Sequence, residues 1–193
     1  AGKSTIVDLL SRLRDPTTGT ISIGGRDLRD IPVRELRACL GLVPQDPFLF
    51  SRSVRDNIRL GVLAREHEED DASAGLGALS VNDASQIAHL GEALDSFEDG
   101  LDTLVGERGI TLSGGQKQRV TIARALILDP DILILDDALS SVDTQTERRI
   151  LEEFEDVMKD RTTVLITHRF NALELVDRIY VRSEERRVGK ECV

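Results

Sequence analysis

The sequence predicts an α/β fold with a mostly parallel sheet flanked by helices. Stretches that suit buried strands alternate along the chain with stretches that suit amphipathic helices, and this alternation is typical of parallel sheets. The runs Ile132–Leu135 and Thr162–Thr167 are rich in β-branched residues and leucine, as expected of strands buried on both faces. With 193 residues, of which 40% are hydrophobic and 31% charged, the chain can form one domain with a substantial core.

The N-terminal part predicts a helix, a short strand, a second helix and a further strand, in that order. The first helix comes from STIVDLLSRLR, and DPTTG ends it. TISIGG predicts a short strand that leads into a turn. IPVRELRACLGLVPQ predicts a short helix with Pro32 near its start, followed by a strand that ends near Val43. The apolar face of the first helix consists of Ile6, Val7, Leu9, Leu10 and Leu13.

The rest of the chain continues the same alternation. Thr111–Leu128 predicts a loop that leads into a helix, from TLSGGQ into KQRVTIARALIL. Thr144–Lys159 predicts an amphipathic helix between the two buried strands, and Ile179–Val181 predicts the beginning of another strand. Val62–Ser85, by contrast, is acidic and then rich in small residues, which predicts an exposed and mobile connection. His67 within it is expected to be solvated, because no second metal ligand stands at helical spacing.

Charge and composition exclude several classes of function. The formal net charge of −10 argues against a groove that binds nucleic acid. No apolar run approaches the ~20 residues that span a bilayer, and no signal peptide is present, so membrane association has to come through a partner or another part of the polypeptide. Cys39 and Cys192 lack metal-ligand spacing, which favours a reduced, cytosolic setting.

Both ends of the chain are expected to be truncated. The chain begins with AGKST, without an initiator methionine, and closes with RSEERRVGKECV. This closing segment, residues 182–193, resembles the translated read-through of a sequencing adaptor, so residues 1–181 are expected to be the native part. The alternative is an ordinary charged terminus.

Gly2–Thr5, which reads GKST at the start of a helix, matches the back half of the phosphate-binding loop G-x-x-x-x-G-K-[ST] of P-loop NTPases. In that loop, backbone amides and the positive end of the helix hold phosphates. Lys3 would reach the terminal phosphates, and the hydroxyl of Ser4 would bind Mg²⁺. Such short strings also arise by chance at helix starts, so the prediction depends on further nucleotide-binding motifs in the same chain.

The string ILILDD supplies a second nucleotide-binding feature, a buried strand that ends in the adjacent carboxylates of Asp136 and Asp137. Parallel strands deliver such groups to the carboxyl edge of the sheet, where α/β proteins bind ligands. Asp136 is therefore predicted to bind Mg²⁺, and the cation would offset the cost of placing charge at the end of a buried strand.

The segment Leu112–Arg119, LSGGQKQR, predicts an anion-binding turn before a helix. Ser113, Gly114 and Gly115 lack bulk, so their backbone amides can approach an anion closely. A helix that begins at about Gln116 would direct its positive end toward the same anion. A serine-capped helix after a glycine turn would explain Ser113 and one glycine, but not the whole string.

Together these motifs resemble the nucleotide-binding domain of ATP-binding cassette transporters, from Ala1 to about Val181. The phosphate loop, Gln45 in VPQDPFLF, LSGGQ, ILILDD, SSVD and His168 in LITHR occur in the order of the family. DPFLFSRSVRDNI and VGERG resemble the exporter branch, in which the ATPase follows its own membrane domain. The resemblance implies a P-loop NTPase fold with an α-helical signature subdomain at about residues 48–128.

The resemblance also implies cofactors, partners and residue roles, with ATP and Mg²⁺ as the cofactors. Gln45 would contact Mg²⁺ and the attacking water while its flanking loop senses the membrane domain, and His168 would contact the terminal phosphate. Asp143, which also suits a helix N-cap, would lie at the dimer seam. Two such domains would close head-to-tail over two ATP molecules at the cytoplasmic face of the membrane and drive transport. The other residues implied to hold ATP are Gly2, Lys3, Ser4 and Thr5, and those implied to contact the opposite subunit's ATP are Leu112, Ser113, Gly114, Gly115 and Gln116.

Asp137 departs from the family, which usually has glutamate at this position to orient and polarise the attacking water. Aspartate is one methylene shorter, and ~1 Å of lost reach can lower a phosphoryl-transfer rate on the order of 10²-fold. We therefore expect the site built from Lys3 and Asp136 to bind MgATP well and to hydrolyse it slowly. Such a site suits a heterodimer with a glutamate-bearing partner, and the competing hypothesis is a homodimer whose backbone shifts to let aspartate suffice.

Three other functions compete with that of an exporter ATPase. Asp137 favours a regulatory subunit that binds ATP and hardly hydrolyses it. A DNA-maintenance ATPase would need a very long coiled coil between phosphate loop and signature, and Thr5–Leu112 contains no sustained heptads. A soluble tandem cassette protein acting on ribosomes is disfavoured by the exporter-like stretches. In every case this chain by itself is expected to be inactive and to bind ATP weakly, because the first part of the phosphate loop lies outside it.

Overall fold

The computed structural model of the chain describes residues 2–66, 79–94, 97–106, 112–159 and 161–181. The adaptor-like segment 182–193, His67 and most of the VGERG stretch lie outside the described residues. Within the described residues, no helix is long and apolar enough to cross a membrane.

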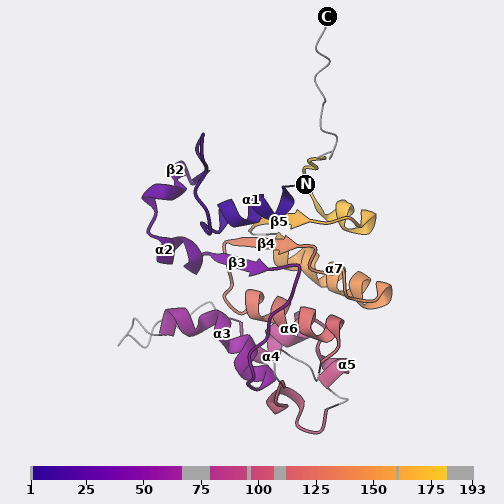
Figure 1. Cartoon of the computed structure of the whole chain (residues 1–193). Helices are drawn as coiled ribbons and strands as arrows, with labels where there is room; N and C mark the ends of the chain where they lie inside the picture. Colours follow the sequence, from indigo (N-terminus) through magenta and orange to yellow (C-terminus); the bar gives the residue numbers. More distant parts are fainter. Residues whose placement is uncertain (1, 67–78, 95–96, 107–111, 160, 182–193) are drawn as a thin grey trace, which may run out of the picture.

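Within the part of the chain that the structure describes, three parallel strands form the central sheet, in the order β3 (Leu40–Val43), β4 (Ile132–Asp136) and β5 (Thr162–Ile166) (Figure 1). The predicted α/β fold with a parallel sheet is therefore confirmed, and each strand ends within one residue of its predicted end. A separate two-stranded antiparallel hairpin, β1 (Ser22–Ile23) and β2 (Arg26–Asp27), accounts for the TISIGG stretch.

Helices cover the sheet on both sides (Figure 1). In Figure 1, α1 lies on one side of the strands, and α3, α4 and α6 lie on the other side. The predicted helices before the sheet, after the signature and between the buried strands are all present. The helices are α1 (Lys3–Leu10), α2 (Val33–Ala38), α3 (Val54–Glu66), α4 (Val81–Ile87), α5 (Gly91–Leu94), α6 (Gly114–Leu126) and α7 (Thr144–Met158), with short 3-10 turns at Leu28–Asp30, Gly100–Asp102 and Phe170–Leu175.

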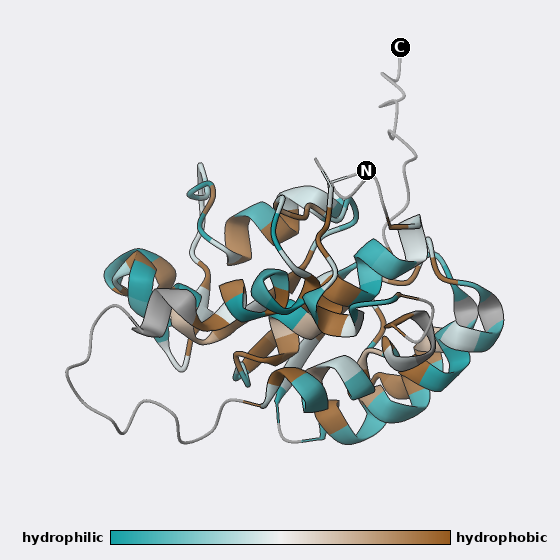
Figure 2. Ribbon diagram, turned by 90° about the horizontal axis from the view of Figure 1, so that it is seen from below, coloured by the Kyte–Doolittle hydropathy of each residue, from teal (hydrophilic) through white to brown (hydrophobic). Residues whose placement is uncertain are grey.

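The two faces of β4 belong to two different clusters of buried side chains. Leu133 and Leu135 pack into the larger cluster with residues of α3, α4, α6 and α7. Ile134, which points to the opposite face, packs into the smaller cluster with Val7 of α1 and Leu36 of α2. Hydrophobic stretches accordingly concentrate in the interior of the ribbon in Figure 2. β4 is thus buried on both faces, as its composition predicts. The same prediction for β5 is wrong, because β5 lies at the edge of the described sheet and its residues are exposed or only partly buried.

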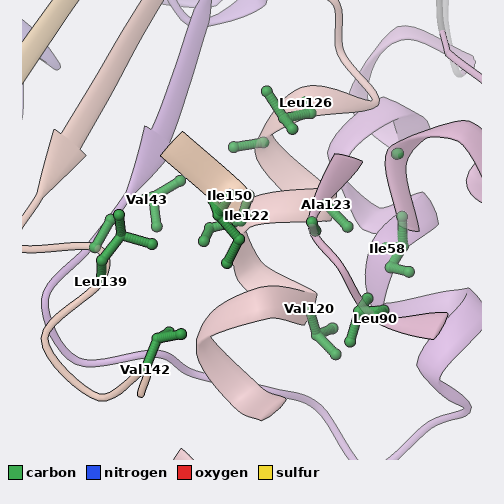
Figure 3. Close-up of a cluster of buried hydrophobic side chains, with 14 of the residues drawn as sticks. Val43, Ile58, Leu90, Val120, Ile122, Ala123, Leu126, Leu139, Val142 and Ile150 are labelled. Atoms are coloured by element: carbon green, nitrogen blue, oxygen red, sulfur yellow. The ribbon is translucent and has the colours of Figure 1, made fainter. Parts of the chain in front are cut away.

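Helix α6 forms the centre of the larger cluster (Figure 3). Val120, Ile122, Ala123 and Leu126 of α6 are each 1% exposed or less, because the sheet and the turn after β4 cover one side of the helix and α3 and α4 cover the other. The three helices α3, α4 and α6 pack on one another between β3 and β4 in the chain. The helical subdomain at about residues 48–128 stays a prediction.

Three further sequence-based expectations about local structure are wrong. The connection predicted at Val62–Ser85 is partly helical, because α3 continues to Glu66 and α4 begins at Val81, and both Val62 and Val81 pack against the larger cluster. Ile6 is 42% exposed and Leu13 is 61% exposed, since α1 ends at Leu10 and only Val7 of this helix is buried.

The third wrong expectation is the strand at Ile179–Val181. These residues form no strand, and the side chains of Ile179, Tyr180 and Val181 are 57%, 87% and 90% exposed. A strand needs a neighbour that accepts and donates its backbone hydrogen bonds. No described strand runs beside this segment, so its β-branched composition alone does not form one.

Candidate functional site

The start of α1 meets the carboxyl ends of β4 and β5 at a cavity of about 270 Å³. In Figure 1, the N-terminal end of α1 lies beside the arrowheads of these two strands. This is the edge of a parallel sheet at which α/β proteins bind ligands. The residues that line the cavity are Gly2, Lys3, Ser4, Gln45, Asp136, Asp137, Ile166 and His168.

The structure therefore brings the phosphate-loop residues, the paired aspartates, Gln45 and His168 together, although they are far apart in sequence. The predicted site residues that do not line this cavity are Thr5, Leu112, Ser113, Gly114, Gly115, Gln116 and Asp143. Ile166 lines it without having been predicted, as the last residue of β5.

The start of α1 has the local structure of an anion-binding helix terminus. Gly2 occupies the N-cap position with φ 77°, a left-handed conformation that glycine adopts without steric cost. The first turn of the helix carries no acidic side chain, and no side chain of a described residue caps its amides. These N–H groups and the positive end of the helix dipole are therefore available to a phosphate.

The side chains of Lys3 and His168 meet across the cavity. The Lys3 Nζ atom lies 3.0 Å from Nε2 and 3.3 Å from Nδ1 of the His168 ring. A lysine ammonium only donates hydrogen bonds, so the ring nitrogen that faces it has to act as an acceptor. Two nitrogen-bearing groups that can face a terminal phosphate therefore converge at one point of the cavity.

Asp136 is the charged group of the site that is most removed from water, at 8% exposed. Burial raises the pKa of its carboxyl above the ordinary value of 3.8, the adjacent Asp137 raises it further, and Lys3 opposes both effects. A cation bound beside Asp136 would relieve the same electrostatic cost.

Replacing Asp136 with asparagine should stabilise the metal-free chain near neutral pH. The pKa of Asp136 is raised on folding, so the folded chain holds this proton more tightly than the unfolded chain does. The destabilisation caused by this group therefore grows as the pH rises above about 4, and it levels off once the pH exceeds the raised pKa. Thermal unfolding of wild type and Asp136→Asn in chelator, across about pH 4 to 8, measures the difference.

Asp131→Asn is the matched control, because Asp131 is an exposed aspartate just before the other end of β4. The unfolding temperature of Asp136→Asn should exceed that of the wild type by an amount that increases with pH, and Asp131→Asn should show no such increase. An Asp136→Asn variant that unfolds at or below the wild-type temperature at the upper end of the pH range contradicts the prediction.

Asp137 occupies a strained turn directly after β4. Its φ is 48°, in the left-handed region that few residues other than glycine adopt and that aspartate adopts more readily than most. Its N–H donates to the carbonyl of Ile166 over 2.8 Å, and its own carbonyl accepts from the N–H of Ser140 over 3.0 Å. The backbone of Asp137 is thus held by both the end of β5 and the following turn.

The backbone around Gln45 is anchored by α6. Gln118, a fully buried residue of α6, donates from Nε2 to the carbonyl of Pro44 over 3.1 Å. Sequence reasoning did not identify Gln118 as part of the site. The sequence signal that could have identified Gln118 is its position, as a polar residue, on the face of α6 that also carries the buried apolar residues.

Arg124 and Asn57 hold the loop that follows Gln45. Arg124 donates to the carbonyls of Phe48 and Asn57 over 2.9 and 2.7 Å, and to the side-chain oxygen of Asn57 over 2.9 Å. Asn57 also accepts from the N–H of Phe50 and donates to its carbonyl, over 2.8 and 2.9 Å. Desolvation lowers the pKa of Arg124 to about 10, so its charge persists at neutral pH. Sequence reasoning did not identify these residues either.

The signature segment forms the first turn of α6. The Ser113 hydroxyl accepts from the N–H of Gln116 over 3.2 Å, and the Gln116 side chain accepts from the N–H of Ser113 over 2.8 Å, which is a complete capping box. The helix begins at Gly114 and not at about Gln116 as predicted, because this cap already satisfies the first turn. Gly114 and Gly115 therefore lie within the first turn of the helix and not before it, and the predicted binding of an anion there stays a prediction.

Gly115 is needed for close packing of the signature segment on the turn after β4. A Cβ atom at Gly115 would lie 2.9 Å from the carbonyl oxygen of Ser141, closer than real Cβ contacts allow. Asp143, at the end of this turn, caps α7 by accepting from the N–H of Thr146 over 2.9 Å, and this bond lowers the pKa of Asp143. The N-cap role of Asp143 is confirmed, and a position at a dimer seam stays a prediction.

The donors that line the cavity suit Mg²⁺. The carboxylate of Asp136, the hydroxyl of Ser4 and the amide oxygen of Gln45 are hard oxygen ligands of the kind that Mg²⁺ prefers. The described residues contain no group of three or more histidine, cysteine and acidic side chains that could hold a metal ion. This set fits Mg²⁺, which is usually bound through one or two carboxylates together with the phosphates of a substrate.

Comparisons with known proteins give one consistent result. A family model described as ABC transporter matches residues 1–140. The mouse protein named ATP-binding cassette sub-family B member 10, mitochondrial, is 44% identical over 192 residues, which are 100% of this chain and 25% of the mouse protein. The Bacillus subtilis protein named putative multidrug export ATP-binding/permease protein YgaD is 42% identical over 180 residues, or 93% of this chain and 29% of that protein.

A solved structure named as that of a bacterial Atm1-family ABC exporter with ATP bound is also similar. Its TM-score is 0.78 at 42% sequence identity, and the similarity covers 90% of this chain and 29% of the exporter chain. The chain thus spans between 25% and 29% of the length of these relatives.

Proposed function

The chain belongs to the ABC transporter family as a nucleotide-binding domain of the exporter type, and from this premise we propose that it binds and hydrolyses MgATP in the cavity between α1 and the ends of β4 and β5. The observation that carries the proposal is the convergence of Lys3, Asp136 and His168 in one cavity. Lys3 and His168 suit the phosphates of a magnesium nucleotide, and Asp136 suits its magnesium ion.

In the proposed reaction, Lys3 and the first amides of α1 hold the phosphates. Asp136, Ser4 and Gln45 would hold Mg²⁺, which supplies positive charge against the phosphate oxygens. His168 would donate a hydrogen bond to the terminal phosphate from the nitrogen that turns toward it.

Asp137 would accept a hydrogen bond from the attacking water and orient it. The water oxygen forms a bond to the terminal phosphorus as the bond from phosphorus to the ADP oxygen breaks, and the carboxylate of Asp137 takes up the released proton. The products are ADP and inorganic phosphate.

A second nucleotide-binding domain would complete the site. Ser113, Gly115 and Asp143 are not among the lining of this cavity, which supports their use on the ATP of an opposite subunit in a head-to-tail dimer. The isolated chain should accordingly be inactive. Closure of such a dimer would drive export by a membrane domain, with the ATPase at the cytoplasmic face.

The weakened-site hypothesis concerns Asp137. Its short side chain supports a site that binds MgATP and turns over slowly, in a heterodimer whose partner carries glutamate. A regulatory, hydrolysis-poor subunit is the second candidate function, supported by the same residue. A homodimer in which the backbone of Asp137 adjusts is the competing arrangement.

The test is ATP hydrolysis by the full-length polypeptide, purified in detergent with any partner subunit that copurifies. Phosphate release should depend on Mg²⁺, and chelation of Mg²⁺ should suppress it. Equilibrium binding of a fluorescent ATP analogue measures the site independently of turnover. A protein that neither binds MgATP nor releases phosphate contradicts the proposed function, and one that binds without turnover supports the regulatory candidate.

A further inference from the structure

Arg169, which immediately follows His168, links the end of β5 to the turn after β4. One guanidinium nitrogen, Nη1, donates to the side-chain oxygen Oε2 of Glu147 in the first turn of α7. The other, Nη2, donates to the backbone carbonyl of Ser140 over 3.0 Å. The forked guanidinium group thus contacts two elements at once, a geometry that a lysine ammonium does not reproduce.

These contacts close a ring of hydrogen bonds and covalent bonds beside the candidate site. The N–H of Asp137 donates to the carbonyl of Ile166, and the carbonyl of Asp137 accepts from the N–H of Ser140, over 2.8 and 3.0 Å. The carbonyl of Ser140 then accepts from Arg169, and the chain from Arg169 back to Ile166 runs through His168. Arg169 is the side-chain link in this ring, since the other links are backbone hydrogen bonds and covalent bonds.

The charge balance makes this link strong. Glu147 is only 2% exposed, and a buried carboxylate is costly unless a cation pairs with it. Arg169 supplies that cation, while Oε1 of Glu147 has no hydrogen-bond partner among the described residues. Without Arg169, the carboxylate of Glu147 would remain buried with no paired cation at this contact. Glu147 lies in the first turn of α7, the same turn that Asp143 caps.

We propose that Arg169 is a positioning residue, which fixes His168 and Asp137 relative to each other and ties both to the start of α7. The inference rests on the proposed function, because it assigns His168 to the terminal phosphate and Asp137 to the attacking water. A shift of either group by about 1 Å lowers a phosphoryl-transfer rate on the order of 10²-fold, so the ring acts on turnover without touching the substrate.

The test compares Arg169→Met with Arg161→Met in the full-length polypeptide. Arg161 is the matched control because it makes the same kind of link at the other end of the sheet, donating to the carbonyl of Pro130 over 3.2 Å and to Asp129 over 3.0 Å. Arg169→Met should lower kcat about tenfold or more, and Arg161→Met should lower it less than about twofold. Both variants should lose thermal stability.

A second readout separates positioning from a purely structural role. His168 faces the terminal phosphate in the proposed function, so Arg169→Met should weaken the binding of MgATP more than that of MgADP. Arg161→Met should leave the ratio of the two affinities unchanged. Loss of stability alone would weaken both nucleotides equally, so equal weakening in Arg169→Met overturns the inference.

Arg169→Lys keeps the positive charge beside Glu147 without the fork to Ser140. It should therefore recover most of the thermal stability and little of the turnover, which also keeps the test sharp if Arg169→Met fails to fold. Full recovery of kcat by lysine overturns the inference, as does an equal loss of kcat in Arg169→Met and Arg161→Met. If the wild-type protein itself neither binds nor hydrolyses MgATP, the proposed function fails and this inference fails with it; if only the variant comparison fails, the proposed function stands.

Discussion

A Lys3→Met variant of the full-length polypeptide is expected to lose MgATP hydrolysis by about 10²–10³-fold, the usual effect of removing one preorganised donor from a developing negative charge. Lys3 is the cation that lines the cavity beside His168, and methionine has a similar length without the charge. The folded state should remain intact, because Lys3 is not fully buried and its side chain contacts the exposed ring of His168 rather than the core. Phosphate release at saturating MgATP by the polypeptide purified without a partner subunit measures the loss.

Lys159→Met is the control for this variant. Lys159 is an exposed lysine just after α7, where it pairs with Asp156 over 2.6 Å, and it does not line the cavity. Its replacement should change neither turnover nor nucleotide affinity by more than about twofold, as is usual for surface ion pairs. A Lys3→Met variant with wild-type turnover would mean that the phosphates are held elsewhere, and the assignment of the cavity would be wrong.

The strands of the sheet and the helices α6 and α7 were predictable because their sequence patterns are strong. Ile132–Leu135 carries apolar side chains at successive positions, and a strand can be apolar at every position only if both faces are buried. The helix after Asp143 was predictable from its amphipathic period and its N-cap residue. Such patterns indicate the type of secondary structure from the segment's own residues, without knowledge of the segments that pack against it.

The secondary structure of other segments depends on what packs beside them, and there the prediction from local sequence is wrong. Ile179–Val181 has the composition of a strand but no described partner strand, so it stays exposed and forms no sheet. Val81 belongs to a helix because its side chain packs on the larger cluster, which the polar residues around it do not indicate. Tertiary packing determines the structure of these segments, and the sequence pattern of one segment does not show which other segments it packs against.

Most residues that line the cavity were predictable because several nucleotide-binding motifs occur in one chain, in the order of the family. The lysine after a glycine at a helix start and the aspartate at the end of a buried strand are each weak signals alone, and Gln45 and His168 were assigned only through the family resemblance. The supporting side chains were not predictable, because nothing in the string around Gln118, Asn57 or Arg169 indicates that each binds a backbone carbonyl of another segment. These side-chain hydrogen bonds to backbone carbonyls follow from the fold, and they hold the backbone of the segments that carry or flank the lining residues.

The backbone conformation of Asp137 affects which acidic side chain can orient the attacking water at this position. With φ at 48°, this residue sits in a conformation that aspartate tolerates better than glutamate does. Hydrogen bonds to Ile166 and from Ser140 hold the conformation from both sides. The backbone at this position is thus held in place, so the reach of the side chain depends on its length and rotamer.

Asp137→Glu is therefore expected to raise turnover by an order of magnitude or more, since one added methylene restores about 1 Å of reach toward the attacking water and positioning of that size is worth on the order of 10²-fold. The less favourable φ should cost the variant some stability, so thermal unfolding and kcat should move in opposite directions. The measurement is single-turnover hydrolysis by the full-length polypeptide purified without a partner subunit, so that only sites built from this chain contribute. Asp137→Asn, which keeps the length of aspartate and removes its charge, is the control and should lower the rate. An unchanged rate in Asp137→Glu would mean that the backbone already brings aspartate within reach of the water, and the homodimer would then be the better arrangement.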